Sequence, residues 1–207
     1  FSFAGYYDPA FMGWGNLRVI NEDRIAPGTG FGTHGHKDME IISYVLSGNL
    51  AHKDSMGNSS TIKTGDVQVM SAGTGIQHSE FNPNADLQTK LFQIWLFPKY
   101  RNVEPRYQQI TLDVAQQKNS FAQILSPNPD DEGVWIHQDA WFYLSDFEAN
   151  FSKKLALQKQ GNGFYIMNIE GEIEVNGEKL EKTNLVHPHC ASIIHCLDNF
   201  GWWFCSI

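Results

Sequence analysis

Short apolar segments alternate with clusters of glycine, proline, asparagine and aspartate along the first half of the chain. These segments are four to eight residues long and rich in β-branched and aromatic residues, which is typical of antiparallel strands. The expected strands are Leu17–Ile20, Glu40–Leu46, Leu50–Lys53, Val67–Met70 and Lys90–Phe97. The expected turn regions between them are Ala26–Gly32, Asp54–Asn58 and Ala72–Gly75. This pattern predicts a β-barrel or a β-sandwich.

The second half repeats the strand pattern more weakly. Its expected strands are Val134–Gln138, Phe164–Ile169, Glu172–Val175 and Trp202–Ile207. The segment Gly171–Gly177 alternates charged and β-branched residues and ends in Asn-Gly, which is the strongest short hairpin signal in the chain. It resembles Val45–Leu50, where a strand also meets a glycine turn and a second strand. We therefore expect an all-β chain with two similar β-barrels in tandem.

A boundary between these barrels is expected where prolines and charges interrupt the pattern, at Pro98–Pro105. This interpretation divides the chain into domains of residues 1–104 and 105–207. Only the region near Leu112–Ala122 has helical character.

Composition narrows the class of protein. Of the 207 residues, 42% are hydrophobic and 18% are charged, as in ordinary globular proteins. No stretch approaches the roughly 20 apolar residues of a membrane-spanning helix, and the apolar run Phe200–Ile207 reads better as a buried strand. The formal charge is −8, and the largest basic cluster is the pair Lys153–Lys154. Direct binding to nucleic acid is therefore not expected, because it usually requires a basic face.

Cysteine usage and the first residue bear on the cellular setting. The three cysteines, Cys190, Cys196 and Cys205, show no CxxC spacing, which favours buried apolar roles in a reducing, cytoplasmic environment. The sequence opens at Phe1 without an initiator Met, so we expect a few natural N-terminal residues to be missing.

Histidines in the first half form a metal-binding pattern. His34 and His36 are two residues apart, and so are His78 and Glu80. Side chains two apart share one face of a strand and lie about 6.6 Å apart along it. One such pair is weak evidence, but an HxH and an HxE, each beside a glycine-rich turn in an all-β pattern, indicate two pairs that surround one ion.

Two carboxylates compete for the fourth ligand position. Glu40 lies about 13 Å beyond His36 in a straight strand, whereas Glu80 is only two residues from His78. We expect Glu80 to be the direct ligand. Glu40 would then lie next to the ligands without binding the ion, or be a buried acid that orients a histidine.

The remaining histidines and the tryptophans have simpler interpretations. His187, His189 and His195 are expected on turns or the surface, because no matching HxH lies on the strands around Gly163–Val175. The second barrel is therefore expected to carry no metal. His52 and His137 are expected to be hydrogen-bonded polar residues, and the six tryptophans to fill the core and interfaces.

The two histidine motifs resemble those of the pirin family, which belongs to the cupin superfamily. The first is Gly28–Glu40 (GTGFGTHGHKDME) and the second is Gly65–Glu80 (GDVQVMSAGTGIQHSE). Three further segments are pirin-like, Phe11–Gly15, Asn21–Ile25 and His52–Asn58, so that the resemblance is dense from Phe1 to about Phe97. It implies a bicupin whose first barrel holds one metal ion through His34, His36, His78 and Glu80.

The resemblance also implies an activity. Quercetin 2,3-dioxygenase activity is known for some pirins, so we expect a metal-dependent dioxygenase that acts on flavonols with dioxygen. Glu80 or Glu40 would accept the proton of the substrate hydroxyl, and Phe31 and Met39 would line an apolar pocket. The expected ion is Fe(II), while Cu, Ni, Co, Mn and Zn suit the same ligands. We expect a monomer.

Two other functions fit the same residues. The first is a metal-dependent interaction module, since animal pirins are implied to be nuclear co-regulators whose iron oxidation state tunes binding to a protein partner. The second is zinc-supported hydrolysis or isomerisation, because a fold does not fix its chemistry. Turnover with a flavonol and dioxygen separates the dioxygenase from the interaction module.

Overall fold

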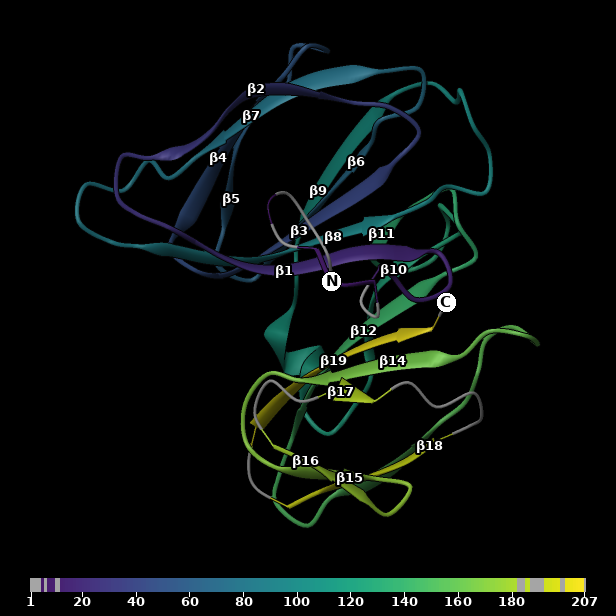
Figure 1. Cartoon of the computed structure of the whole chain (residues 1–207). Coiled ribbons are helices and arrows are strands. Elements are labelled where there is room, and N and C mark those ends of the chain that lie inside the picture. The colour runs from purple at the N-terminus through teal and green to yellow at the C-terminus, as the bar shows by residue number, and fades with distance from the viewer. Residues whose placement is uncertain are drawn as a thin grey trace. The chain divides into compact units, whose positions relative to one another are not determined.

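The structure is a computed structural model that describes residues 5, 7–9, 12–181, 185–186, 192–197 and 200–206, with the backbone alone at 185–186, 192–195 and 200–206. Its described elements are strands and one short 3₁₀ helix (Figure 1). The chain divides into two compact units, the first formed by Phe1–Leu112 with Val134–Gln138 and the second by Asp113–Gly133 with Asp139–Ile207. These units differ from the predicted domains of 1–104 and 105–207, because residues 105–112 and 134–138 belong to the first compact unit. The domain boundary stays a prediction.

The first unit consists of two facing antiparallel sheets (Figure 1). Its strands are β1 (Leu17–Ile25), β2 (Gly30–His36), β3 (Glu40–Ser47), β4 (Asn49–Asp54), β5 (Ser59–Lys63), β6 (Asp66–Ser71), β7 (Ile76–Phe81), β8 (Thr89–Leu96), β9 (Arg106–Thr111) and β11 (Val134–Trp135). One sheet has the order β1-β8-β3-β6-β9 and the other β2-β7-β4-β5. The inward side chains of both sheets form the interior of a barrel.

The second unit is built in the same way. Its strands are β10 (Ala122–Ser126), β12 (Trp141–Phe147), β13 (Ser152–Leu155), β14 (Phe164–Asn168), β15 (Ile173–Val175), β16 (Glu178–Leu180), β17 (Leu185–Val186), β18 (Ser192–Cys196) and β19 (Phe200–Ser206). One sheet contains β10-β12-β19-β14-β17 in that order and the other β13-β18-β15-β16. The prediction of an all-β chain with two barrels is confirmed.

The expected Asn-Gly hairpin joins β15 to β16. Val175 pairs with Glu178, so Asn176 and Gly177 are the two turn residues. Both have positive φ, at 52° and 88°, as a type I′ turn requires.

The expected helical region is a single 3₁₀ turn, Val114–Gln117. The Asp113 side chain accepts a hydrogen bond from the Ala115 amide at its start. Asn119 follows in a left-handed conformation, with φ of 50°, which cannot continue a helix. The segment therefore forms less helix than its sequence predicts.

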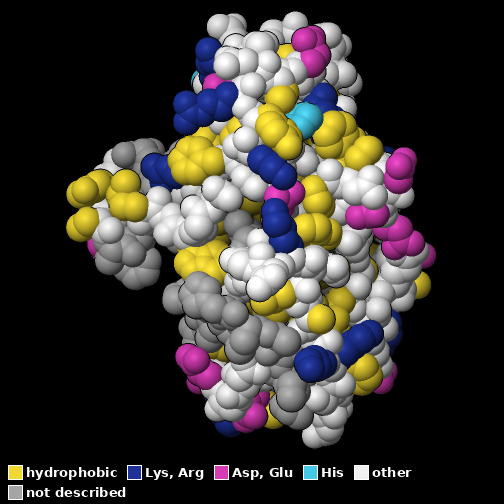
Figure 2. All heavy atoms as spheres, turned by 90° about the vertical axis from the view of Figure 1, so that its right-hand side faces the viewer, with side chains coloured by type: hydrophobic (Ala, Val, Ile, Leu, Met, Phe, Trp, Pro, Cys, Tyr) yellow, Lys and Arg dark blue, Asp and Glu magenta, His cyan; other side chains and the backbone are white. Residues whose placement is uncertain are grey.

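The surface carries both signs of charge. On the face shown in Figure 2, lysines and arginines lie in small groups separated by hydrophobic and acidic side chains. Among the described residues, no helix is long and apolar enough to cross a membrane.

Candidate metal centre

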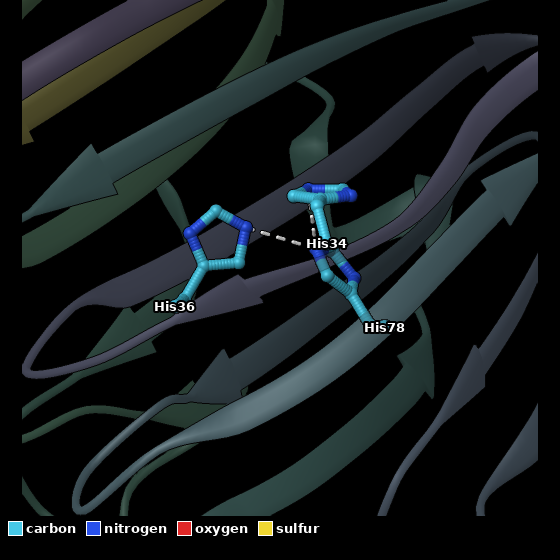
Figure 3. A group of neighbouring side chains, drawn as sticks. All are labelled: His34, His36 and His78. Carbon is cyan, nitrogen blue, oxygen red and sulfur yellow. Dashed lines mark hydrogen bonds between the residues drawn. The ribbon is translucent and has the colours of Figure 1, made fainter.

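Three histidines meet on the inner face of the first barrel. His34 and His36 lie two residues apart on β2, and His78 on β7 pairs directly with His34. Residues two apart share a face, and directly opposed residues of antiparallel strands share it too. The three rings therefore point toward one another (Figure 3). We call His34, His36 and His78 the histidine trio.

The spacing of the nitrogens fits a metal ion better than hydrogen bonds alone. The Nε2 atom of His78 lies 3.0 Å from Nε2 of His36 and 3.1 Å from Nε2 of His34. A ring nitrogen either donates one hydrogen bond or accepts one, so His78 Nε2 cannot satisfy both neighbours. Two nitrogens bound at about 2.1 Å in adjacent positions of an octahedral ion are about 3.0 Å apart. The trio thus has the donor atoms and the spacing that one first-row ion needs.

The protonation of the trio also suits a metal. Nδ1 of His34 lies 2.8 Å from the carbonyl oxygen of Gly32. When Nδ1 donates its proton to that oxygen, Nε2 keeps a free lone pair facing the other two rings. Burial lowers the pKa of His36 to about 4 and that of His78 to about 3, and repulsion from a protonated His34 acts in the same direction. His36 and His78 are therefore neutral, ligand-ready imidazoles at neutral pH.

Glu80 is a buried carboxylate two residues beyond His78. Its exposed fraction is 1%. Ser43 Oγ donates a hydrogen bond to Oε1 over 3.3 Å, and Gln93 Nε2 donates one to Oε2 over 2.7 Å. Burial raises the pKa of Glu80, and these two hydrogen bonds oppose the increase.

Glu80 lies next to His78, which is also a member of the histidine trio. Ligand atoms of His52, His78 and Glu80 lie within 4.8 Å of one another, and His78 belongs to both this group and the trio. The expectation that Glu80 completes the ligand set of the trio stays a prediction.

Gly30 allows β2 to lie close to Glu80. A Cβ atom on Gly30 would be 2.2 Å from the backbone carbonyl oxygen of Glu80 and 2.6 Å from Cα of Phe81. Both contacts are with backbone that cannot turn aside, so a larger residue would push β2 away from β7. Gly30 thus permits the close approach of the two strands that carry the trio.

His52 and Asp54 are site residues that the sequence interpretation undervalued. On β4, His52 pairs with Glu80 and Asp54 with His78. Nε2 of His52 lies 3.2 Å from Oδ2 of Asp54, and its ring packs 4.9 Å from that of Tyr107. The signal was available, because His52 and Asp54 have the same spacing of two as the metal-binding pairs. His52 is a bonded polar residue, as expected, but it lies beside the candidate metal centre.

The structure does not bring Glu40 together with the trio. Glu40 pairs with Ser71, and Ser71 Oγ donates a hydrogen bond of 2.6 Å to its carboxylate. Burial raises the pKa of Glu40 to about 7, while Ser71, Arg106 and the backbone N–H of His137 lower it. Inward residues of β3 are Ile41 and Ser43, so Glu40 lies on the opposite face of that strand.

A surface depression and two partly exposed apolar residues lie around the trio. A depression of about 500 Å³ lies beside His36 and is lined by Gly35, Lys37, Ser55, Gly75, Ile76 and Gln77. Phe31 pairs with Glu80, and the register shift between Phe31 and His34 places both on the inner face. Phe31 is 41% exposed, and Met39 packs on the apolar cluster of Ile41 and Ile76. The expectation that Phe31 and Met39 line an apolar pocket stays a prediction.

The other predicted residues lie elsewhere. His137 belongs to the first unit, where its ring packs 4.8 Å from that of Trp135. His187, His189 and Cys190 lie outside the described residues, as do the side chains of His195 and Cys205. Cys196 is buried, as expected. Within the described part of the second unit no group of metal-binding side chains gathers, and the absence of metal there stays a prediction.

The fold and the trio define a bicupin with a candidate metal centre in its first barrel. Residues 1–96 match the family profile described as Pirin, and residues 123–185 match that described as Quercetinase C-terminal cupin domain. A protein named quercetin 2,3-dioxygenase from Escherichia coli strain K12 is 45% identical over 183 residues, 86% of this chain and 76% of that protein. This chain belongs to the pirin family, as its motifs implied.

Solved structures agree with this assignment. The crystal structure of YhhW from Escherichia coli matches with a TM-score of 0.93 at 39% identity, covering 100% of this chain and 88% of that one. The crystal structure of bacterial pirin YhhW from Escherichia coli in complex with nickel(II) matches with a TM-score of 0.92 at 37% identity, covering 100% and 89%.

Proposed function

We propose that this chain is a metal-dependent dioxygenase of the pirin type that opens the central ring of flavonols such as quercetin. The observation that carries the proposal is the histidine trio, whose nitrogens lie at ligand spacing beside the buried carboxylate of Glu80. The name of the Escherichia coli relative, quercetin 2,3-dioxygenase, supports the same reaction.

His34, His36 and His78 would hold one ion, with Glu80 as the fourth ligand. Three neutral imidazoles and one carboxylate leave open positions on a six-coordinate ion, and they disfavour a closed structural zinc site, which commonly uses thiolates. The ion would lower the pKa of a bound flavonol hydroxyl and, if redox-active, promote the reaction with dioxygen. Fe(II) is the proposed ion. The nickel(II) complex of the YhhW relative makes Ni(II) the first alternative to test.

Glu80 is the proposed acceptor of the flavonol hydroxyl proton. Ser43 and Gln93 hold both of its oxygens in place beside His78, so the carboxylate is positioned before substrate binds. Glu40, the other carboxylate considered, lies on the opposite face of β3 beside Ser71. We therefore assign the proton transfer to Glu80 alone.

Phe31 is proposed to contact the aromatic substrate. It lies on the inner face of the edge strand β2, and its exposed ring is available to stack on a planar ligand. In the reaction, both atoms of dioxygen enter the ring-opened product and one carbon leaves as carbon monoxide.

Dioxygen uptake with quercetin tests the proposal. Metal-free protein would be loaded separately with Fe(II), Ni(II), Cu(II), Co(II), Mn(II) and Zn(II), and uptake and carbon monoxide release would be measured together. We expect equal amounts of both with at least one redox-active ion, and none with the His78→Ala variant. No uptake by protein shown to be fully loaded would contradict the dioxygenase and favour the metal-dependent interaction module.

A further inference from the structure

Edge strands of the two facing sheets border the first barrel on both sides, β5 with β9 on one and β1 with β2 on the other. On the β5–β9 side, Ser60 of β5 is hydrogen-bonded to Tyr107 of β9 at 2.5 Å, and Gln109 donates to the carbonyl of Thr61. On the other side, β1 and β2 are the edge strands of the two facing sheets and are joined by a short turn (Figure 1). Six of the seven residues of β2 are exposed, including the inward Phe31 and His34. Among the described residues, β2 is thus the exposed border of the trio.

A row of polar side chains crosses the sheet that faces the trio. Residues directly opposed in register are Asn21 with Gln93, Gln93 with Ser43, Ser43 with Gln68, and Gln68 with Gln109. Directly opposed residues share a face. Because Ser43 and Gln93 both donate to Glu80, the whole row lies on the inner face. We call these five residues the polar row.

The members of the polar row differ in their partners. Ser43 and Gln93 bind Glu80, and Gln109 donates to Asp66 and to the carbonyl of Thr61. The Oε1 atom of Gln68 is fully buried and has no hydrogen-bond partner among the described residues. Asn21, on the edge strand β1, likewise makes no side-chain hydrogen bond within the described part of the chain. The row thus ends at the sheet edge in an amide without a hydrogen-bond partner among the described residues.

Asp23 lies beside Asn21 on the same face. It is two residues further along β1 and pairs with the buried Leu91, so its side chain is inward. Within the described residues no hydrogen bond or ion pair engages its carboxylate, and burial raises its pKa. Asn21 is paired with Gln93, which donates to Glu80, so this face of β1 and the Glu80 carboxylate belong to one interior. Burial raises the pKa of Glu80, and the charge of Asp23 acts in the same direction.

The two neighbours of Asp23 on β1 differ from it in their partners. Glu22 and Arg24 lie on the outward face of β1 and form an exposed ion pair of 2.9 Å. Among the described residues, the surface carboxylate of Glu22 thus has a partner, while the half-buried carboxylate of Asp23 does not. A half-buried carboxylate without a partner is costly unless a hydrogen-bond donor reaches it.

We propose that Asp23, with Asn21 beside it, determines substrate specificity by accepting a hydrogen bond from a phenolic hydroxyl other than the one that binds the metal. This inference rests on the proposed flavonol substrate. An ionised carboxylate only accepts, whereas the Asn21 amide both donates and accepts, so the pair suits a hydroxyl group. Such a site rejects a ligand that lacks the hydroxyl, because its buried polar groups are then left unpaired.

Ligand binding without turnover tests the proposal. Zinc-loaded protein would be titrated under dioxygen-free conditions with quercetin, kaempferol, galangin and 3-hydroxyflavone, which carry progressively fewer ring hydroxyls. We expect the native protein to bind at least one hydroxylated flavonol about 10- to 100-fold more tightly than 3-hydroxyflavone. In Asp23→Ala this preference should fall to within about twofold, with the affinity for 3-hydroxyflavone unchanged. Asn21→Ala should show a smaller loss of the same kind.

Control measurements separate this role from a merely structural one. Glu22→Gln alters the adjacent outward carboxylate and should keep the full preference, and Asp23→Ala should still bind one zinc ion. Equal weakening of all four ligands, an unchanged preference, or no flavonol binding by the native protein would each overturn the inference. Selective binding without turnover by any redox-active ion would refute the dioxygenase and leave the role of Asp23 intact. Turnover of quercetin by the native protein, together with an unchanged ligand preference in Asp23→Ala, would support the dioxygenase and refute the role of Asp23.

Discussion

The interiors of the two barrels differ although their folds are alike. In the second unit the core is a continuous apolar cluster comprising Tyr143, Phe147, Leu155, Phe164, Ile166, Ile173, Val175, Leu180 and Cys196. In the first unit the inward residues of β3 read Ile41, Ser43 and Val45. Ile41 and Val45 belong to two separate small clusters, and Ser43 of the polar row lies between them.

This difference shows how one fold serves two purposes. An apolar core that includes the rings of Tyr143, Phe147 and Phe164 fills the second barrel and stabilises it, because each buried ring removes a large apolar area from water. Polar side chains interrupt the core of the first barrel, and burying them costs stability unless they are bonded. Glu80, Ser43 and Gln93 offset part of that cost for one another. The first barrel therefore gives up apolar packing for polar side chains around the candidate metal centre.

The largest effect is expected in the second barrel. Phe164 is fully buried, so Phe164→Ala should lower the free energy of unfolding by about 3 to 5 kcal/mol. Because the site lies in the other unit, the folded variant should still bind one metal ion per chain. Urea unfolding and metal analysis would check both. A variant of native stability that had lost its metal would break the proposed division of roles.

Removing a trio member should have the converse effect. His78→Ala deletes the nitrogen that lies close to both His34 and His36, and we expect metal affinity to fall by about a thousandfold, equal to about 4 kcal/mol. Metal analysis after dialysis measures the loss, and circular dichroism should show a folded chain. His137→Ala, in the same unit but outside the trio, should keep its metal. Retained metal in His78→Ala would refute the site.

Glu40 should make the stability of the first unit depend on pH. Its folded pKa of about 7 exceeds the ordinary value of 4.5, so the neutral form is favoured on folding. Its stabilising contribution is complete below pH 4.5 and is lost as pH rises through 7, by about 3 kcal/mol in total. Glu40→Gln should remove this change. Urea unfolding of both metal-free proteins between pH 4.5 and pH 8 measures the difference, and parallel pH profiles would be evidence against it.

The smallest effect is expected at the β15–β16 turn. Gly177 has a φ of 88°, where a side chain is strained, so Gly177→Ala should cost about 1 kcal/mol. Gly32 is a suitable control, because its φ is not in the left-handed region and an added Cβ would meet nothing within 4 Å. Thermal unfolding should show a clearly smaller change for Gly32→Ala. Equal changes would show that turn conformation does not explain the cost.

Much of the fold could be predicted because strand signals are local. Alternation and the Asn-Gly pair identified the β15–β16 hairpin, and β-branched runs identified β3 and β8. The central strand β12 was missed, since Trp141–Phe147 is buried on both faces and does not alternate. β2 was expected to be a turn as far as Gly32, because its glycines conceal a strand that begins at Gly30.

The candidate site was predictable only in part, for a related reason. The HxH and HxE pairs follow from the period of two along single strands. The partners of Glu80, Ser43 and Gln93, lie on other strands, and which residues meet depends on register. Asp23 was not identified for the same reason, because the sequence of β1 alone does not show that its inner face is directed toward the carboxylate of Glu80 on β7.

The ligands of the bound ion test the central claim most directly. X-ray absorption of the nickel(II)-loaded protein counts histidine nitrogens around the metal and distinguishes them from sulfur. We predict three imidazoles and no sulfur in the native protein, and fewer imidazoles in whatever metal His78→Ala retains. A native spectrum with fewer than three imidazoles, or an identical spectrum for His78→Ala, would show that the histidine trio is not the metal centre.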